Sequence, residues 1–212
     1  MWKRGGKRLF DVVAAMLLLV LLAPVLLLVA LVVLLGMGPP VIFRQRRPGL
    51  RGALFTIVKF RTMREAVNDG REPLPDEHRL TKVGRFLRRT SLDELPTLWN
   101  VVRGDMSLVG PRPLLPQYLD RYSPRQARRH DVRPGITGLA QVSGRNALSW
   151  KDRLAFDAWY VENLSLRVDM SILLKTALVV LSRGGISQPG HATVEEFMGS
   201  SEETGTSPSD DA

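Results

Sequence analysis

An apolar run from residue 9 to residue 35 constrains the fold of this chain most. Only Asp11, near its start, and Pro24, in its middle, interrupt the run. As one straight helix, about 27 residues rising 1.5 Å each would reach roughly 40 Å, enough to cross a bilayer. A cleaved signal peptide is not expected, because the run is too long and no small-residue cleavage site follows it. A single transmembrane helix is therefore the simplest interpretation.

The break at Pro24 and the flanking charges favour a different membrane topology. Proline removes a helical hydrogen bond and clashes with the preceding turn, so the helix should break near mid-membrane. Both flanks are basic, and basic flanks tend to stay on the cytoplasmic side. We therefore expect residues 1–36 to form a re-entrant hairpin that enters and leaves one leaflet. The bases are Lys3, Arg4, Lys7 and Arg8 before the run, and Arg44, Arg46, Arg47 and Arg51 after it.

The charge balance indicates a polyanionic partner. The net charge is +9, but residues 195–212 hold six acids and no base, so the preceding body carries +15. Such a body attracts nucleic acid, anionic lipid or phosphorylated substrates. The apolar anchor favours a membrane setting, and no nucleic-acid partner is expected. We predict a catalytic domain over residues 37–199 and a disordered acidic tail over 200–212. The chain has no cysteine, which excludes disulfides and thiolate metal sites.

Two adjacent carboxylates, Asp93 and Glu94, are the strongest candidates for chemistry. Pro96 suits a first helical position and Gly104 the residue just past a helix end, which places the pair at a helix N-terminus. Oxygen ligands of this kind hold Mg²⁺ together with substrate phosphates. A structural alternative stays open, because Ser91 and Glu94 also fit a capping box.

Arginines surround the acidic pair in sequence. Three of them lie in the stretch RFLRRT at residues 85–90, and Arg112 is fixed between two prolines. Arginine binds phosphate bidentately, so this adjacency suits a phosphate site, although a helix surface that neutralises nearby acids would look the same. The stretch KFRTM at residues 59–63 interleaves bases with apolar residues, as at a solvated strand end or a headgroup contact.

The remaining segments predict an α+β, mostly helical fold with amphipathic interfacial helices. Short β-prone runs at 41–45 and 53–60 should form a hairpin around a Pro-Gly turn. Helices are expected at 117–130, 148–163 and 172–181, the last too short to span a membrane. Asp157, among aromatic residues of the second helix, is either a satisfied surface charge or a partner for an arginine. A glycine-punctuated stretch at 133–146 allows backbone to approach a ligand closely.

Together these segments resemble a known family, the bacterial sugar transferases, and within it the small monotopic phosphoglycosyl transferases. The resemblance covers roughly residues 7–199. It rests on four motifs: KFRTM at 59–63, TSLDELP at 90–96, GDMSLVGPRP at 104–113 and PGITG at 134–138. The resemblance implies a re-entrant helix at the cytoplasmic face of the bacterial inner membrane. It further implies transfer of a sugar-1-phosphate from a UDP-sugar to undecaprenyl phosphate, with Mg²⁺ required and UMP released.

The same resemblance assigns roles to individual residues. It makes Asp93 the nucleophile and Glu94 a second Mg²⁺ ligand beside it. The other residues that it implicates are Arg88 and Arg112 at the phosphates, Arg145 at the nucleotide, and Lys59, Gln141 and Asp157 lining or bracing the pocket. One departure is visible: the helix break, often Ser-Pro in the family, is Ala-Pro at Pro24 here. The stretch 190–199 resembles a subgroup that acts on bacillosamine-type diamino sugars, and the oligomeric state, a homodimer included, is left open.

Two non-enzymatic alternatives explain fewer features. A basic membrane-anchored scaffold accounts for the anchor and the charge, but not for an acidic pair set among arginines. A nucleic-acid-binding protein accounts for the charge alone and leaves the apolar run without a role. The phosphoglycosyl transferase hypothesis explains all of these features together.

Overall fold

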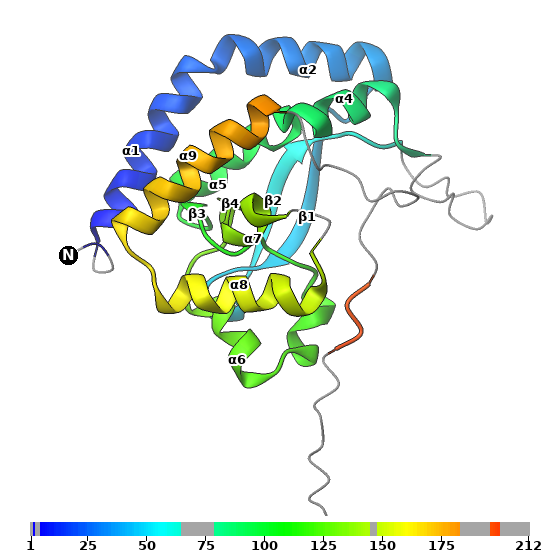
Figure 1. Cartoon of the computed structure of the whole chain (residues 1–212). Coiled ribbons are helices and arrows are strands. Elements are labelled where there is room, and N and C mark those ends of the chain that lie inside the picture. Colours follow the sequence, from blue (N-terminus) through cyan, green and yellow to red (C-terminus); the bar gives the residue numbers. More distant parts are fainter. Residues whose placement is uncertain (1, 3–4, 65–78, 145–147, 183–195, 200–212) are drawn as a thin grey trace, which may run out of the picture.

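The computed structural model describes residues 2, 5–64, 79–144, 148–182 and 196–199. Helices surround two small sheets, which confirms the predicted α+β, mostly helical class (Figure 1). Arg145 and the tail 200–212 lie outside the described residues. In chain order the elements are α1 (Gly6–Leu21), α2 (Ala23–Met37), β1 (Ile42–Pro48), η2 (Leu50–Gly52), β2 (Leu54–Phe60), α4 (Lys82–Thr90), η3 (Leu92–Thr97), α5 (Leu98–Arg103), β3 (Ser107–Val109), η4 (Pro116–Arg121), α6 (Pro124–Ala127), η5 (Arg128–Asp131), β4 (Gly135–Thr137), α7 (Leu139–Ser143), α8 (Trp150–Glu162) and α9 (Leu166–Ser182), where η marks a 3₁₀ helix.

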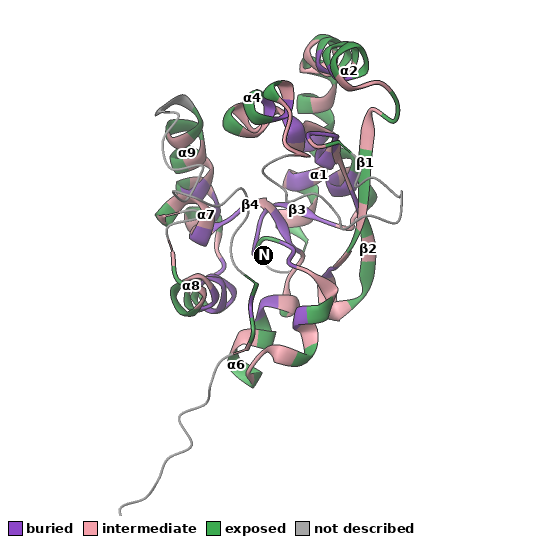
Figure 2. Cartoon of the chain, turned by 90° about the vertical axis from the view of Figure 1, so that its right-hand side faces the viewer, coloured by how far each residue is buried: buried purple, intermediate pink, exposed green. Residues whose placement is uncertain are grey.

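The apolar run folds as two helices, α1 and α2, and the second is bent by 63° from the direction of the first. Pro24 lies in the first turn of α2, where its missing N–H costs no hydrogen bond, so the predicted break is confirmed. Within the described chain, no single helix is long and apolar enough to cross a membrane, whereas this bent pair meets both criteria jointly. In Figure 1, α1 rises along one side of the domain and α2 runs across its top. Figure 2 shows α2 mostly exposed or half-buried.

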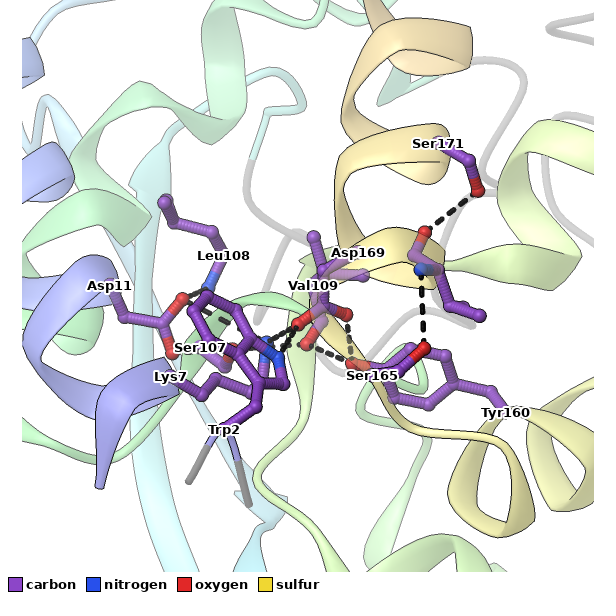
Figure 3. Close-up of polar contacts among 11 residues, drawn as sticks. Trp2, Lys7, Asp11, Ser107, Leu108, Val109, Tyr160, Ser165, Asp169 and Ser171 are labelled. Carbon is purple, nitrogen blue, oxygen red and sulfur yellow. Dashed lines mark hydrogen bonds and ion pairs between the residues drawn. The ribbon is translucent and has the colours of Figure 1, made fainter. Parts of the chain in front are cut away.

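Asp11 fixes α1 to the domain by bonds to the start of β3. Its carboxylate is 2 % exposed and accepts hydrogen bonds from the Ser107 hydroxyl (2.7 Å) and the Leu108 backbone N–H (3.2 Å) (Figure 3). Burial of a carboxylate is costly unless its oxygens are hydrogen-bonded. The one acid inside the apolar run therefore specifies which side of α1 faces the domain.

A second buried carboxylate, Asp169 on α9, holds the beginning of the chain (Figure 3). It accepts hydrogen bonds from the Trp2 indole N–H and the Lys7 ammonium, both at 2.8 Å. The Tyr160 hydroxyl of α8 donates to its other oxygen at 2.7 Å. Three donors from three segments thus converge on one carboxylate, which joins α1, α8 and α9.

Two arginines fasten the two ends of the bent helix pair to the same domain. Arg8 donates to the carbonyls of Val101 and Val102 in the last turn of α5, at 2.6 and 2.9 Å. Arg61, just after β2, donates to the carbonyls at the end of α2, including that of Met37 at 2.6 Å. Because Arg61 is only 8 % exposed, both expectations for the KFRTM stretch, a solvated strand end or a headgroup contact, are wrong for this residue. Cations at helix C-termini also interact favourably with the helix dipole.

The two sheets bring the central motifs together. β1 and β2 pair antiparallel from Ile42↔Phe60 to Pro48↔Leu54, which confirms the predicted hairpin. β3 and β4 pair parallel, and the chain just beyond β3 lies against the start of β4. A Cβ on Gly135 would lie 2.1 Å from the Gly110 nitrogen, so the backbones can approach this closely only with glycine. The core cluster around these strands includes Ala15 of α1.

One predicted helix is wrong. Residues 117–130 form 3₁₀ helix η4, the short α6 and 3₁₀ helix η5 instead of one continuous helix. The cause is Pro124, which disfavours helical conformation at Ser123. Ser123 is extended and caps α6 through a capping box with Gln126. The helix predicted at 148–163 is confirmed as α8, and the one at 172–181 is the second half of α9.

The network around Asp169 predicts a large loss of stability for Asp169→Asn. The substitution replaces an acceptor by an NH₂ donor that faces other donors, and it leaves the Lys7 charge without its closest partner. We expect a loss of about 3–5 kcal/mol. For a chain of this size that loss lowers the melting temperature by roughly 6–20 °C. Thermal unfolding in detergent measures it, with the exposed Asp120→Asn as control. Equal melting temperatures for the two variants would contradict this role of Asp169.

Candidate active site

The acidic pair lies on η3, and the local backbone explains its orientation. Ser91 ends α4 in the left-handed conformation (φ 57°), and its side chain makes no capping hydrogen bond to η3. The capping-box alternative for Glu94 is therefore wrong. Pro96 lies inside η3, not at a first helical position, and α5 begins only at Leu98. Gly104 does follow the end of α5 in the left-handed conformation, as predicted.

Glu94 is held between two cations from different parts of the chain. Lys59 of β2 lies 2.5 Å from its Oε1, and Arg112, after β3, lies 2.7 Å from the same oxygen. Among the residues that the structure describes, the second oxygen receives one bond, a long one from Arg112 at 3.4 Å. Although burial opposes ionisation, Arg112 and Lys59 hold the pKa of Glu94 well below its ordinary value. Glu94 is thus a permanent anion that orients both cations.

Asp93 has a different electrostatic environment from its neighbour. It is 9 % exposed, and both close ion pairs of the cluster go to Glu94. Burial, and then the charge of Glu94, raise the pKa of Asp93 above its ordinary value. Lys59, Arg112 and Arg88 act in the opposite direction. A desolvated carboxylate with a raised pKa beside cations is the arrangement expected of a functional acid.

Asp157 braces the cluster from behind, through an arginine that the sequence analysis did not single out. Arg129 is 3 % exposed and donates to Asp157 at 2.8 Å from Nη2 and 3.1 Å from Nε. The same Nη2 donates to the backbone carbonyl of Arg112 at 2.7 Å. Of the two interpretations left open for Asp157, partner of an arginine is the one that the structure confirms. Its burial and its two bonds to one carboxylate single out Arg129 within a basic stretch of the sequence.

Of the other predicted site residues, some lie near the acidic pair and others do not. Arg88 contributes charge to Asp93, and its Nε donates to the Thr62 hydroxyl at 3.1 Å. Gln141 lies on α7 and donates to the Ile136 carbonyl at 2.8 Å, so the bond that it makes braces the turn after β4. The predicted nucleotide contact, Arg145, falls outside the described residues. The structure therefore gathers Lys59, Asp93, Glu94 and Arg112, with Arg88 and Asp157 beside them.

The acidic pair was predicted to hold a metal ion, and the described structure offers no larger group of candidate ligands. Within the described ranges, no cluster of three or more Asp, Glu or His side chains is arranged to hold a metal ion. Magnesium is often bound by one or two carboxylates that share it with substrate phosphates. Asp93 and Glu94 satisfy that smaller requirement, and their mutual repulsion would be relieved by a cation.

Comparison with known proteins identifies the family. The family described as bacterial sugar transferase matches residues 2–183.

The chain belongs to the bacterial sugar transferase family.

Among its relatives, an uncharacterized sugar transferase, EpsL of Bacillus subtilis, is 53 % identical over 194 residues, covering 92 % of this chain and 96 % of the relative. The UDP-glucose:undecaprenyl-phosphate glucose-1-phosphate transferase of Caulobacter vibrioides is 48 % identical over 186 residues, 83 % of this chain and 70 % of the relative. The undecaprenyl-phosphate galactose phosphotransferase of Salmonella typhimurium is 42 % identical over 196 residues. That match covers 84 % of this chain, which spans only 41 % of the Salmonella protein.

The match confirms the family and the enzyme class predicted from the motifs, a phosphoglycosyl transferase. The scaffold alternative is therefore set aside. The four motifs that carried the resemblance all lie within the matched residues.

The electrostatics of the pair predict how Arg88 affects ionisation. Arg88 stabilises the Asp93 carboxylate, so Arg88→Gln should raise the already elevated pKa of Asp93 further. Carboxyl ¹³C shifts, measured against pH in protein freed of divalent metal, report the midpoint. The neighbouring Arg89 is exposed and is no cause of the shift, so Arg89→Gln should leave the midpoint unchanged. Equal midpoints in the two variants would mean that Arg88 does not act on Asp93.

Proposed function

We propose that this enzyme transfers a sugar-1-phosphate from a UDP-sugar to undecaprenyl phosphate and releases UMP. The observation that carries the proposal is the buried Asp93, placed beside Glu94 and within the field of Lys59, Arg112 and Arg88. The names of the Caulobacter and Salmonella relatives support a lipid phosphate acceptor. Those names give glucose and galactose, whereas the end of this chain resembles a diamino-sugar subgroup, so the proposal covers UDP-sugars as a class. The reaction would be the first membrane step of a glycoconjugate or polysaccharide pathway.

In the proposed mechanism Asp93 is the nucleophile. One of its oxygens forms a bond to the sugar-bearing phosphorus, and the bond from that phosphorus to the bridging oxygen breaks. UMP leaves with the electron pair. An oxygen of undecaprenyl phosphate then attacks the same phosphorus, and the aspartyl bond breaks to restore the carboxylate. A two-step route of this kind divides one difficult displacement into two easier ones.

The residues around Asp93 would compensate for its weak nucleophilicity. Arg112 and Lys59 place positive charge where the diphosphate must lie, and they are already oriented by Glu94. Preorganised charge of this kind stabilises the transition state more than the ground state. Asp157 and Arg129 keep the Arg112 backbone in place.

We further propose that the acidic pair holds Mg²⁺. When bound, Mg²⁺ would screen the charge of the diphosphate. Asp93 is the better ligand, because both close cation contacts of the pair go to Glu94. The long bond at Glu94 Oε2 leaves that oxygen as the second ligand. The two carboxylates, together with substrate phosphates, suit a hard cation.

The membrane topology that we propose is the re-entrant hairpin at the cytoplasmic face of the bacterial inner membrane. Both ends of the bent pair are bonded to one domain, through Arg8 at the start and Arg61 at the end. A span would place these ends on opposite sides of the bilayer, which is incompatible with both sets of bonds. The apolar residues left exposed suit lipid contact; they include Leu17, Val20, Leu21, Leu27, Leu28 and Leu35.

The covalent route makes a prediction that needs no lipid acceptor. Labelled UMP should exchange into the UDP-sugar when enzyme, UDP-sugar and Mg²⁺ are present and the lipid acceptor is absent. Asp93→Asn keeps the shape but removes the nucleophile, so exchange and net transfer should both fall by at least roughly a thousandfold. Asp120→Asn, an exposed acid, should retain both activities. Normal net transfer without any exchange would favour direct attack by the lipid phosphate.

The hairpin topology predicts labelling from one side only. The native chain has no cysteine, so Gly6→Cys and Ala53→Cys introduce single exposed thiols before and after the bent pair. A membrane-impermeant maleimide should label both thiols in inverted inner-membrane vesicles and neither of them in spheroplasts. Labelling of the two thiols from opposite sides would show a full span.

A further inference from the structure

The segment 196–199 returns to the domain beside the start of α8 (Figure 1). Phe197 is 3 % exposed, and its ring centroid lies 5.7 Å from those of Tyr118 and Tyr122 and 5.3 Å from that of Trp150. The next residue, Met198, is 78 % exposed. One ring of this segment is therefore inserted into an aromatic cluster while its neighbour faces outward.

Polar bonds fix the segment in register. Arg121 of η4 donates to the Glu196 carboxylate at 2.9 Å and to the Phe197 carbonyl at 2.5 Å. Gln117 donates to the same carboxylate at 2.7 Å. The position of the Phe197 ring is thus set by backbone and side-chain bonds as well as by apolar packing.

A short series of contacts leads from Phe197 to the active site. Its ring stacks on Tyr122, with 24° between the planes. The Tyr122 hydroxyl accepts a hydrogen bond from Arg129 Nη1 at 3.1 Å. Arg129 Nη2 donates to the backbone carbonyl of Arg112, whose guanidinium pairs with Glu94.

We propose that Phe197 is a positioning residue for Arg112 and acts through Tyr122 and Arg129. This role rests on the proposed function, in which Arg112 binds the diphosphate. The flanking prolines restrict the backbone at Arg112, so a shift of its carbonyl moves the whole residue and is not absorbed locally. Phe197 keeps the Tyr122 ring in one orientation, and the hydroxyl of that ring holds one edge of the buried Arg129 guanidinium.

The test compares turnover and affinity in full-length variants. Phe197→Ala should lower kcat for UMP release about tenfold with little change in the KM for the UDP-sugar, because displacements on the order of 1 Å already cost catalysis heavily. Tyr122→Phe keeps the stacked ring but removes the hydroxyl, and it should lower kcat in the same direction. Met198→Ala, which alters the exposed neighbour, should retain the wild-type kcat.

A double-mutant cycle separates positioning from general destabilisation. If Phe197 acts through Arg112, then Phe197→Ala should change kcat less than about twofold in an Arg112→Ala background. The same tenfold loss in both backgrounds would overturn the proposal, since Phe197 would then act elsewhere.

Should Phe197→Ala fail to fold, Tyr122→Phe decides: an unchanged kcat overturns the role and a lowered kcat supports it. A wild-type chain that releases no UMP would overturn the proposed function and this role with it, whereas an active wild type with full kcat in both variants would overturn this role alone.

Discussion

The pairing of one glutamate with two cations is the interaction on which the site depends. Glu94 draws Lys59 from β2 and Arg112 from the loop after β3 to a single oxygen. Lys59 and Glu94 are partly buried, and an uncompensated buried charge is costly, so the two ion pairs favour the assembly of these three segments. The arrangement also affects the pKa of Asp93. Burial and the negative charge of Glu94 raise this pKa, while both close ion pairs go to Glu94. The two adjacent carboxylates therefore differ: Glu94 takes both close ion pairs, whereas the pKa of Asp93 is raised above its ordinary value.

Buried carboxylates with hydrogen-bond donors from other segments also join the apolar helices to the domain. Asp11 and Asp169 are both almost fully buried, and each accepts hydrogen bonds from a distant part of the chain. Ala15 of α1 belongs to the same core cluster as residues of α5, β3 and α9. Part of the first helix is therefore core, although its composition alone suggests membrane.

The sequence predicted local chemistry well and tertiary partners poorly. The helix break followed from Pro24, and the acidic pair followed from adjacent carboxylates among arginines. Ser91 and Glu94 fit a capping box equally well in sequence, but in the structure Ser91 makes no capping bond and Glu94 pairs with the distant Lys59 and Arg112. Arg129 could not be chosen among neighbouring arginines, because its selection depends on Asp157, 28 residues away. The broken helix at 117–130 was a different kind of error, since Pro124 already signalled it in the sequence.

The hydrogen bonds from Arg61 to the end of α2 affect where the charged cluster lies relative to the apolar helices. This residue follows directly on β2, the strand that carries Lys59, and it holds the last carbonyls of α2. Arg61 therefore bonds the end of the apolar helices directly to the chain that follows the Lys59 strand. With the helices seated in a bilayer, the depth of Asp93 relative to the lipid phosphates would be set by protein geometry and not by diffusion of a tethered domain. An amphiphilic acceptor would then meet the carboxylate at one fixed height, and its search would be confined to two dimensions.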